Sequence, residues 1–349
     1  MNVRSGCRPA CVLRLSIAVV ALILVLAGSV MSNARPVFAA GSAPDASAAV
    51  QTAQHQFNSG NYPAALKTLQ AASAQNPNSA EVQYWLGRCY YELRDYDNAI
   101  VAGEKAVELD PKNSLFHQWL GTIYGGKADR DRSFSDARKV KKEFEEAVRL
   151  DPSNVQARRD LEQYLMEAPW VVGGNKDEAR NQVTAIEGID PIQGHLARAE
   201  FDLESKKPEL AEKEYRDVLA AKPKQIDPYL DVITFFIHEN RPADLEAAIQ
   251  GAAQIAPNDP RLNYARGVLG VLSSKDLSRA EEYLKSYLAS TPDRSDWPPH
   301  AAAREWLGRL YEAQGKRAEA AEQYRAALQL DPKRKEAKAR LEKLEKVSG

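Results

Sequence analysis

The sequence predicts an all-α fold, an α-solenoid of about eight helical hairpins followed by a C-terminal capping helix. The main observation is a series of prolines that each close a helix-like stretch and that recur at nearly regular spacing along the chain. The prolines are Pro77, Pro111, Pro152, Pro191, Pro223, Pro257, Pro292 and Pro332. Three endings, 109–113, 150–154 and 330–334, are nearly identical. A period of about 34 residues predicts one supersecondary unit stacked repeatedly.

Residues 1–39 are predicted to be a secretory signal peptide. Three arginines precede the apolar run Leu15–Met31, and small or β-branched residues follow at Val37 and Ala39, with cleavage expected after Ala39 or Ala40. The run is at the short limit for a membrane-spanning helix, so an uncleaved signal anchor is the alternative. Residues 40–46 are small and polar and are predicted to be a disordered leader.

Composition excludes several classes of function and of stabilisation. The formal net charge of the chain is -1, which gives no global argument for binding nucleic acid or an acidic surface. Of three cysteines, Cys7 and Cys11 lie in the predicted signal, so only Cys89 remains and no internal disulfide can form. The fold must therefore be stabilised by packing.

The repeat units of the predicted solenoid, 47–334, share a register when each closing proline is numbered 32. In the unit 80–113, positions 7, 8 and 11 hold Leu86, Gly87 and Tyr90, and positions 20 and 27 hold alanine. In the unit 301–334 the same five positions hold Leu307, Gly308, Tyr311, Ala320 and Ala327, and position 24 holds Tyr324. Residues four apart share a helix face, and small residues let two antiparallel helices approach closely. The proline then stops the second helix.

This pattern, L-G-x-x-Y in one helix and A-x-x-x-F-x-x-A in the next, resembles the tetratricopeptide repeat. The resemblance covers essentially all of the chain after the signal. It implies a right-handed α-solenoid whose first helices line a concave groove that binds a peptide or protein.

Two insertions and a tail depart from the regular repeat. The stretch 125–133 contains seven extra residues, 168–176 about five, and 293–300 is predicted to be a loop. An insertion before 144–152 paired with the segment 168–174 resembles exported bacterial envelope members of the family. Residues 335–349 are mostly charged with a thin apolar stripe, which predicts a capping helix with a polar outer face.

No catalytic or metal-binding motif is visible, and no cofactor is expected. None of the five histidines has a His or Cys three or four residues away, and there is no phosphate loop or G-x-S-x-G. His117 and His195 fall at position 4, where the family usually carries a buried aromatic, and are predicted to be packed. Cys89 is predicted to be a small buried side chain. The chain is therefore predicted not to be an enzyme, with a divergent site between Trp170, Gly173 and the groove as the alternative.

The second insertion ends in a predicted helix cap. Asn175 and Glu178 have the spacing of an N-cap and its reciprocal partner. Free N–H groups there could hold an anion. The alternative is a flexible hinge with Trp170 folded back as a plug.

The basic insertion, residues 127–142, overlaps the extra residues at 125–133 and contains seven Lys and Arg against three Asp, a formal charge of +4. The candidate residues for an acidic partner or anionic lipid are Lys127, Arg130, Arg132 and Arg138. The alternative is a solvated helix face with internal ion pairs.

The resemblance implies that positions 2, 5, 9, 12 and 13 of first helices face the groove. The candidate partner-binding residues there are Tyr84, Arg88, Tyr91, Arg159, Glu305 and Arg309. Trp85, Trp119 and Trp306, at position 6, are predicted to contact the adjacent unit. The Lys and Asn of a peptide-carboxylate clamp are absent, which argues against a chaperone C-terminal tail as ligand.

These observations predict a non-catalytic scaffold or adaptor of the bacterial cell envelope, exported to the periplasm, that binds a protein or peptide in the groove. The alternative is a membrane-tethered assembly or biogenesis factor that contacts anionic lipid or polymer through 127–142. An inner-membrane anchor facing the periplasm, or secretion, are the alternative locations. No nucleic-acid partner is expected, and the sequence specifies neither the partner nor the oligomeric state.

Overall fold

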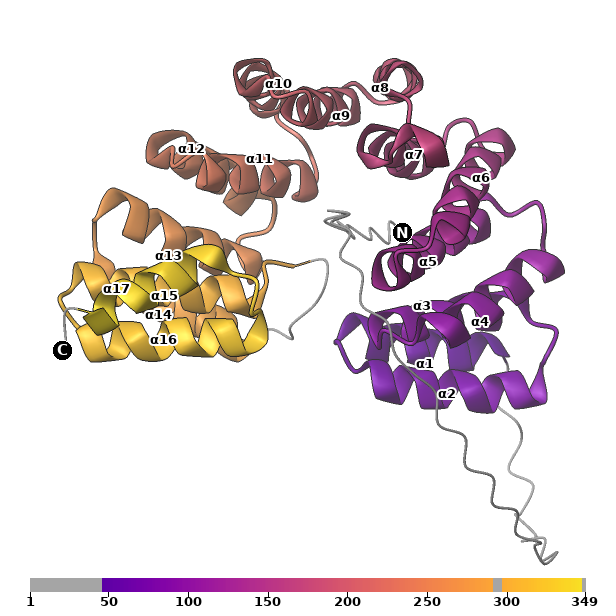
Figure 1. The fold of residues 1–349 in the computed structure, drawn as a ribbon, viewed down its shortest axis with the longest axis horizontal. Coiled ribbons are helices and arrows are strands. Elements are labelled where there is room, and N and C mark those ends of the chain that lie inside the picture. The colour runs from indigo at the N-terminus through magenta and orange to yellow at the C-terminus, as the bar shows by residue number, and fades with distance from the viewer. Residues whose placement is uncertain (1–45, 291–296, 347–349) are drawn as a thin grey trace, which may run out of the picture. The chain divides into compact units, whose positions relative to one another are not determined.

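The computed structural model describes residues 46–290 and 297–346. These residues form seventeen α-helices and one 3-10 turn and contain no strand (Figure 1), which confirms the all-α prediction. The helices are α1 Ala46–Asn58, α2 Tyr62–Gln75, α3 Ala80–Glu92, α4 Tyr96–Leu109, α5 Ser114–Asp131, α6 Phe134–Leu150, α7 Val155–Glu167, α8 Lys176–Ile189, α9 Pro191–Glu204, α10 Pro208–Ala220, α11 Asp227–His238, α12 Pro242–Ile255, α13 Arg261–Ser273, α14 Leu277–Ser290, α15 His300–Ala313, α16 Arg317–Leu330 and α17 Lys335–Lys346. In the described residues, α1 to α16 follow one another as eight pairs, as predicted, and α17 comes last without a pair.

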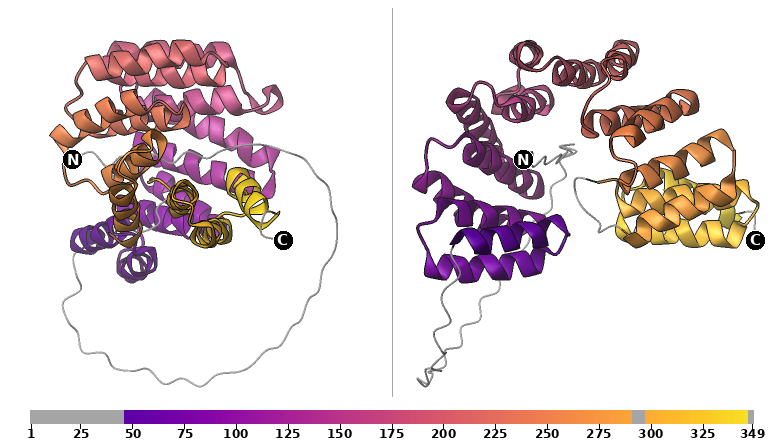
Figure 2. Two further views of the ribbon diagram at one scale, coloured as in Figure 1. Left: turned by 90° about the vertical axis from the view of Figure 1, so that its left-hand side faces the viewer. Right: turned by 180° about the vertical axis from the view of Figure 1, so that it is seen from behind.

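The contacts divide the described residues into two compact units whose boundary lies within α6. We call residues 46–140 the N-terminal unit and residues from 141 onward the C-terminal unit. In the hairpins of either unit the two helices lie side by side and antiparallel, as two further views show (Figure 2). In the C-terminal unit, each first helix also contacts the first helix of the next hairpin, from α7 to α9 and onward to α15. These contacts are more extensive than those between second helices, so the first helices form a continuous face.

Helix boundaries follow from local signals. Ser79 caps α3 by accepting a hydrogen bond from the Val82 amide, and Asn154 caps α7 in the same way. Second helices end just before the closing prolines, as α4 does before Pro111. Pro191 has a further role, because it is also the first residue of α9. At that position its missing N–H does not remove a hydrogen bond of the helix.

The small residues at position 8 permit the close approach predicted. A Cβ added to Gly308 would lie 2.5 Å from Cε1 of Tyr324, which is fully buried on the partner helix α16. Ala320 and Ala327 of α16 are also fully buried. A larger residue at Gly308 would therefore push α15 and α16 apart.

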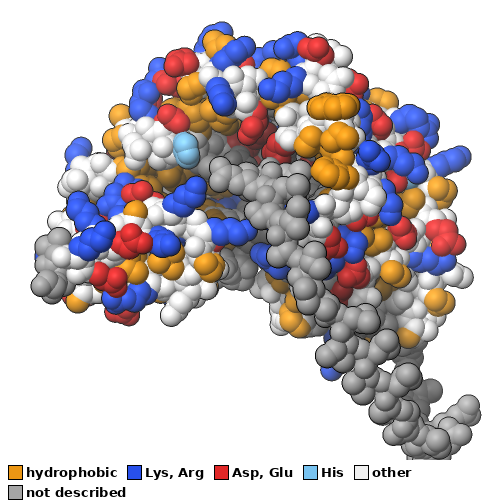
Figure 3. All heavy atoms as spheres, in the orientation of Figure 1, with side chains coloured by type: hydrophobic (Ala, Val, Ile, Leu, Met, Phe, Trp, Pro, Cys, Tyr) orange, Lys and Arg blue, Asp and Glu red, His pale blue; other side chains and the backbone are white. Residues whose placement is uncertain are grey.

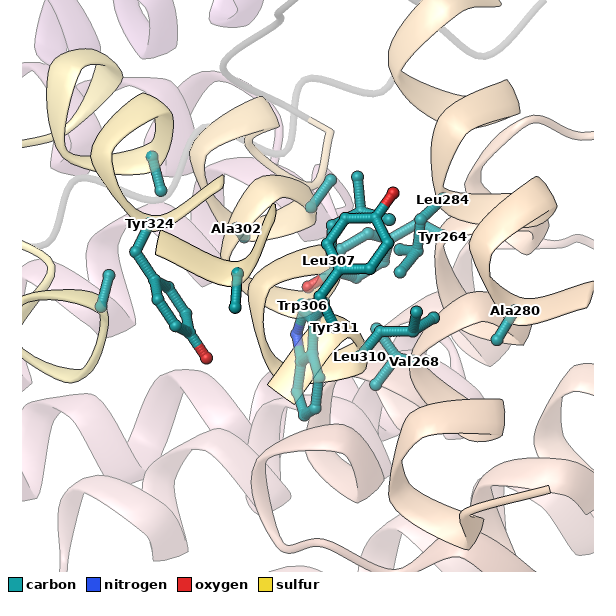
Figure 4. Close-up of a cluster of buried hydrophobic side chains, with 14 of the residues drawn as sticks. Tyr264, Val268, Ala280, Leu284, Ala302, Trp306, Leu307, Leu310, Tyr311 and Tyr324 are labelled. Atoms are coloured by element: carbon teal, nitrogen blue, oxygen red, sulfur yellow. The ribbon is translucent and has the colours of Figure 1, made fainter. Parts of the chain in front are cut away.

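The cluster of buried residues at the C-terminal end is shared by five helices, α13 to α17 (Figure 4). Trp306 of α15 hydrogen-bonds with Tyr264 of α13, so it contacts the adjacent unit as predicted. Trp119 packs on Tyr84 and Trp85 on Phe57, with ring centroids 6.2 Å and 5.5 Å apart, which confirms the same prediction in the N-terminal unit.

The first insertion lengthens two helices, α5 and α6. α5 has 18 residues and α6 has 17, against 13 or 14 in most others. Arg132, between them, takes a left-handed conformation with φ of 54°. Gly126 lies inside α5, where a Cβ would come within 2.6 Å of the Tyr96 ring and 2.9 Å of the Tyr91 ring.

The second insertion is a short 3-10 turn, Trp170–Val172, followed by two glycines. Gly173 has φ of +103°, and a Cβ on Gly174 would lie 1.7 Å from the Ala168 carbonyl oxygen, so both positions require glycine. The Asn175 side chain accepts from the amides of Asp177 and Glu178 and donates to the Glu178 carboxylate, as predicted for a cap. Trp170 is 86% exposed, so the predicted plug is wrong.

α17 packs against α16 through an apolar stripe, with Ala337 and Leu344 buried and Leu341 against the same cluster. Its other face is charged. This arrangement is what a capping helix requires, because it covers the last hairpin and presents a polar surface to solvent.

Three predictions lie wholly or partly outside the described residues: the signal peptide 1–39, the leader up to residue 45 and residues 293–296 of the loop 293–300. Within the described ranges, no helix is both long and apolar enough to cross a bilayer.

Candidate partner-binding surface

The first helices carry all six predicted partner-binding residues, but the structure divides these residues into three separate settings. Tyr84, Arg88 and Tyr91 lie on α3 in the N-terminal unit. Arg159 lies on α7, and Glu305 and Arg309 lie on α15.

Arg88 is the centre of a buried aromatic cluster. Only 4% of the residue is exposed, and its guanidinium lies 4.2 Å, 4.5 Å and 4.7 Å from the ring centroids of Trp119, Trp85 and Phe57. It also donates to the Tyr84 hydroxyl at 3.4 Å. A cation surrounded by ring faces is stabilised by their quadrupoles, most strongly where water is excluded. Here Arg88 joins α3 to α1 and α5.

Tyr84 and Tyr91 are also buried. Burial raises the pKa of Tyr84 above its ordinary value, although Arg88 acts in the opposite direction. The same desolvation raises the pKa of the neighbouring Cys89 thiol to about 12. That thiol is therefore protonated and inert at neutral pH, in accord with its predicted packing role.

Arg159 has a different environment, because it joins two first helices. Its Nη2 donates to Glu200 Oε1 at 2.7 Å and its Nη1 to Gln193 Oε1 at 3.0 Å, both on α9. Burial opposes its charge, but Glu200 and then Asp231 of α11 outweigh burial and hold the pKa of Arg159 above its ordinary value. Arg159 thus lies on the continuous face formed by α7, α9 and α11.

Glu162, one turn further along α7, was not among the predicted residues. It is buried, with only 3% of the residue exposed. Burial first, and then the Glu200 carboxylate, raise the pKa of Glu162 to about 8, although Arg159 acts in the opposite direction. The signal in the sequence was the pair Leu161-Glu162, which stands where Leu86-Gly87 and Leu307-Gly308 stand in other units.

Glu305 and Arg309 lie against the C-terminal cap. Glu305 is buried and accepts from Arg334 at 2.6 Å, at the start of the segment leading into α17. Arg309 lies over the Trp306 ring, with Cζ 3.9 Å from its centroid. Arg340 of α17 donates to Glu312 of α15 at 2.8 Å. The cap therefore engages the last hairpin's first helix.

The charges of the basic insertion are largely paired. Lys127 contacts Asp97 of α4 and lies 3.1 Å from Asp131. Arg130 Nε donates to Asp131 at 2.6 Å, and this contact first, then Lys127, lower the pKa of Asp131 to about 2. These pairs brace α5 against α4. Arg132 and Arg138 are exposed.

Lys141 links α6 to the second insertion within the C-terminal unit. Its Nζ donates to the Gly173 carbonyl at 3.2 Å and to Glu178 at 2.9 Å. These two contacts hold the short 3-10 turn and the start of α8 against α6.

The histidines fill two different roles. His117 is buried and hydrogen-bonds with the Pro111 carbonyl at 3.1 Å, as a packed side chain would. His195 is partly exposed, and its Nδ1 lies 2.6 Å from Glu214 Oε2 of α10. With Asp217, these residues form the metal-ligand-like group found in the described part of the chain, with potential ligand atoms within 4.8 Å of one another.

Comparison with known proteins agrees with this arrangement of helices. A family model described as tetratricopeptide repeat matches residues 50–114 and 272–335. This chain contains tetratricopeptide repeats. Tetratricopeptide repeat protein 37 of Xenopus laevis is 28% identical over 124 residues, which is 36% of this chain and 8% of that protein. The matched region thus spans a small part of the curated relative's length.

The repeat protein is also similar to solved structures. The Cut9-Hcn1 hetero-tetramer of the APC/C matches with a TM-score of 0.50 and 12% identity over 85% of this chain and 55% of that chain. A thermophilic TPR protein of Thermus thermophilus matches with a TM-score of 0.46 and 20% identity over 55% of this chain and 100% of that chain. The likeness to Cut9-Hcn1 supports a tetratricopeptide-type α-solenoid. Such repeats typically serve as non-catalytic scaffolds for protein–protein interaction.

Proposed function

We propose that this repeat protein is a non-catalytic adaptor of the bacterial cell envelope that binds a protein or peptide on the first-helix face of its C-terminal unit. The observation that carries the proposal is the continuous face of α7, α9 and α11. Polar side chains line it at position 9 of successive hairpins, namely Gln163, Glu200 and Thr234. A row of accessible polar groups on packed helices offers a rigid surface of hydrogen-bonding groups to an extended chain.

In this proposal the N-terminal unit does not supply the residues that contact the partner. Tyr84, Arg88 and Tyr91 are buried, so their side chains support the position of α3 and are poorly placed as contact residues. Substituting all three with alanine would therefore test folding before it tested binding. The candidate contacts move to the accessible residues of α7, α9 and α11.

Export to the periplasm remains part of the proposal and rests on the three-part pattern of residues 1–40. Mass spectrometry of the protein isolated from cells would decide it. A mature N-terminus at residue 40 or 41 is expected. If the run Leu15–Met31 is retained in the isolated protein, the alternative of a membrane-tethered factor would be supported instead.

Blocking the first-helix face tests the binding proposal. The double variant Gln163→Trp, Thr234→Trp places two bulky rings on this face, and Lys213→Trp places one on the exposed side of α10 as a control. In affinity capture from the envelope fraction, the partners recovered with the wild type should also be recovered with the control and should be absent with the double variant. Equal partner recovery by all three folded proteins would contradict the proposal.

Contact with anionic lipid through 127–142 is less well supported. Lys127 and Arg130 already pair with Asp97 and Asp131, which leaves a weaker positive field than the +4 formal charge suggests. We expect no salt-sensitive binding to vesicles that contain about 30% phosphatidylglycerol as the anionic lipid. If the wild type does bind such vesicles, and the double variant Arg132→Glu, Arg138→Glu does not, contact with anionic lipid through this segment would be supported instead.

A further inference from the structure

A cavity lies in the C-terminal unit between the start of α12, the second half of α13 and the first half of α14. Its volume is about 670 Å³. Leu269 and Leu272 of α13, Pro242 and Ala243 of α12 and Ala280 of α14 form an apolar lining. Sites for small molecules are typically concave, of about 300–1,000 Å³, and mostly apolar with a few polar groups. The cavity therefore has the size and the lining of a small-molecule site.

Three basic side chains also line the cavity. They are Arg266 of α13, Lys275 of the turn between α13 and α14, and Arg279 of α14. Cζ of Arg266 and Cζ of Arg279 lie 5.8 Å and 5.6 Å from the centroid of the Tyr283 ring. The ring attracts both guanidiniums and favours this placement. Two guanidiniums beside one ring present planar sets of N–H donors, which suit a carboxylate.

These three cations have no carboxylate partner in the part of the chain that the structure describes. Arg266 bonds instead to the side-chain oxygen of Asn263, at 3.5 Å. Elsewhere on the C-terminal helices, Lys and Arg side chains lie among Asp and Glu side chains (Figure 3), and pairs such as Lys285 with Glu281 form. The basic side chains of the cavity therefore remain available to an anionic ligand.

Two acids limit the charge that such a ligand can carry. Asp276 caps α14 by accepting from the Arg279 amide at 3.3 Å, and Glu246 of α12 also lines the cavity. Three basic and two acidic side chains give the lining a formal charge of +1. A ligand with one negative charge matches this lining, whereas a polyanion would meet like charges.

The turn at the cavity differs from the other short hairpin turns. Ser274 and Asp276, on either side of Lys275, both take left-handed conformations, with φ of 53° and 46°. The turns of the hairpins α1–α2, α3–α4, α9–α10, α11–α12 and α15–α16 each contain one left-handed residue. Strained backbone of this kind is concentrated at functional sites. The departure from the regular hairpin therefore supports a role for this cavity beyond packing.

We propose that the cavity binds a small organic acid, which is an apolar body that carries one carboxylate. The carboxylate bonds to Arg266 and Arg279, and the apolar body lies against the leucines of α13. This site is separate from the face of α7, α9 and α11, so the inference does not depend on the adaptor function.

The test uses the purified protein and 4-(trifluoromethyl)phenylacetate, which has one carboxylate on an apolar ring. The matched probe is 4-(trifluoromethyl)phenylacetamide, which has nearly the same shape and no charge. Fluorine NMR should show that the acid binds at least about tenfold more tightly than the amide. In amide spectra of the protein, the acid should shift the signals of Gly270 and Ser273, which line the cavity.

A blocking variant locates the site. Ala243→Trp places a bulky ring at the cavity from the first turn of α12, where Ala243 is exposed. Ala247→Trp places the same ring on the exposed side of α12, outside the cavity, and is the control. Ala243→Trp should weaken binding of the acid by about tenfold or more, and Ala247→Trp should leave it unchanged. Unchanged binding by a folded Ala243→Trp protein would overturn the proposal.

A charge variant tests the recognition of the carboxylate. Arg266→Gln, Arg279→Gln should lower the affinity for the acid to that for the amide. Arg317→Gln, Lys338→Gln removes two exposed charges from α16 and α17 and should have no effect. If the first double variant does not fold, Arg279→Gln, at an exposed position, supplies the same readout. Unchanged affinity for the acid in that variant would contradict the proposal.

Three results with the wild type would also overturn the proposal. They are absence of acid binding, equal affinity for the acid and the amide, and shifted signals spread away from α12, α13 and α14. Partner capture separates this inference from the adaptor function, because Ala243→Trp should recover the same partners as the wild type. Loss of those partners with Ala243→Trp would contradict the independence of the two sites.

Discussion

At the scale of single residues, buried charges distinguish the two units. Arg88 is a buried cation stabilised by aromatic rings, and Glu162 is a buried acid in the company of other acids. The first has the surroundings that stabilise a charge, whereas the second lacks them. Substitution of each side chain should therefore change stability in opposite directions.

Arg88→Ala should destabilise the protein by about 2–4 kcal/mol, because it removes the cation–π contacts and leaves a cavity between α1, α3 and α5. Lys67→Ala, on the exposed side of α2, is the control and should change stability by less than about 0.5 kcal/mol. Urea unfolding followed by tryptophan fluorescence measures both. Equal midpoints for the two variants would show that the aromatic cluster does not stabilise the fold.

Glu162→Gln should instead stabilise the protein, increasingly so at high pH. The folded-state pKa of about 8 lies above the unfolded value of 4.5, so the folded state binds the additional proton between these values. Stability of the wild type should therefore fall as pH rises through this window, by on the order of 3–5 kcal/mol, and the variant should lack that slope. Thermal melts from pH 5 to 8 measure the difference. Parallel pH profiles would mean that Glu162 is solvated or paired.

At the scale of elements, the first insertion shows how extra residues can extend helices. The sequence predicted the location of the extra residues at 125–133 but not the structure that they adopt. In the structure, Gly126 is needed because Tyr91 and Tyr96 lie against the α5 backbone. Those tyrosines belong to the preceding hairpin, so a local reading of the glycines could not detect them.

The two neighbouring glycines give a matched pair of substitutions. Gly126→Ala should cost about 1–3 kcal/mol, because its Cβ would lie 2.6 Å from the Tyr96 ring. Gly125→Ala meets only Val140, at 4.0 Å, and should stabilise by up to about 1 kcal/mol through helix propensity. Thermal unfolding of both variants checks the prediction. Stabilisation by both would show that the tyrosine rings move aside freely.

Deletion of 335–349 tests α17 as a cap. We expect faster hydrogen exchange in α15 and α16, because Leu328 and Tyr324 lose cover and Glu312 loses the arginine of α17 that pairs with it. Leu330 is already half exposed and should contribute little. Deletion of 347–349 is the control. Unchanged exchange in α15 and α16 after the longer deletion would exclude a capping role.

At the scale of the whole molecule, the sequence predicted the number and order of the helices well. Closing prolines, caps and small residues are local signals that recur along the chain, and each repeat reinforces the same register. The surface was harder to predict. The register placed Tyr84, Arg88 and Tyr91 at groove positions, but the burial of Arg88 depends on Phe57 and Trp119 from neighbouring hairpins. Glu162 was missed because a single acid in a helix ordinarily indicates an exposed position.

The central claim is that partners bind the first-helix face, and site-specific photo-crosslinking in living cells tests it most directly. A photoreactive phenylalanine at Thr234 of α11 reports on that face, and the same residue at Lys213 of α10 reports on the second helices. The account predicts a discrete crosslinked partner from position 234 that is absent from position 213 and is lost when Gln163→Trp is added. Crosslinks from position 213 alone, or identical products from both positions, would contradict it.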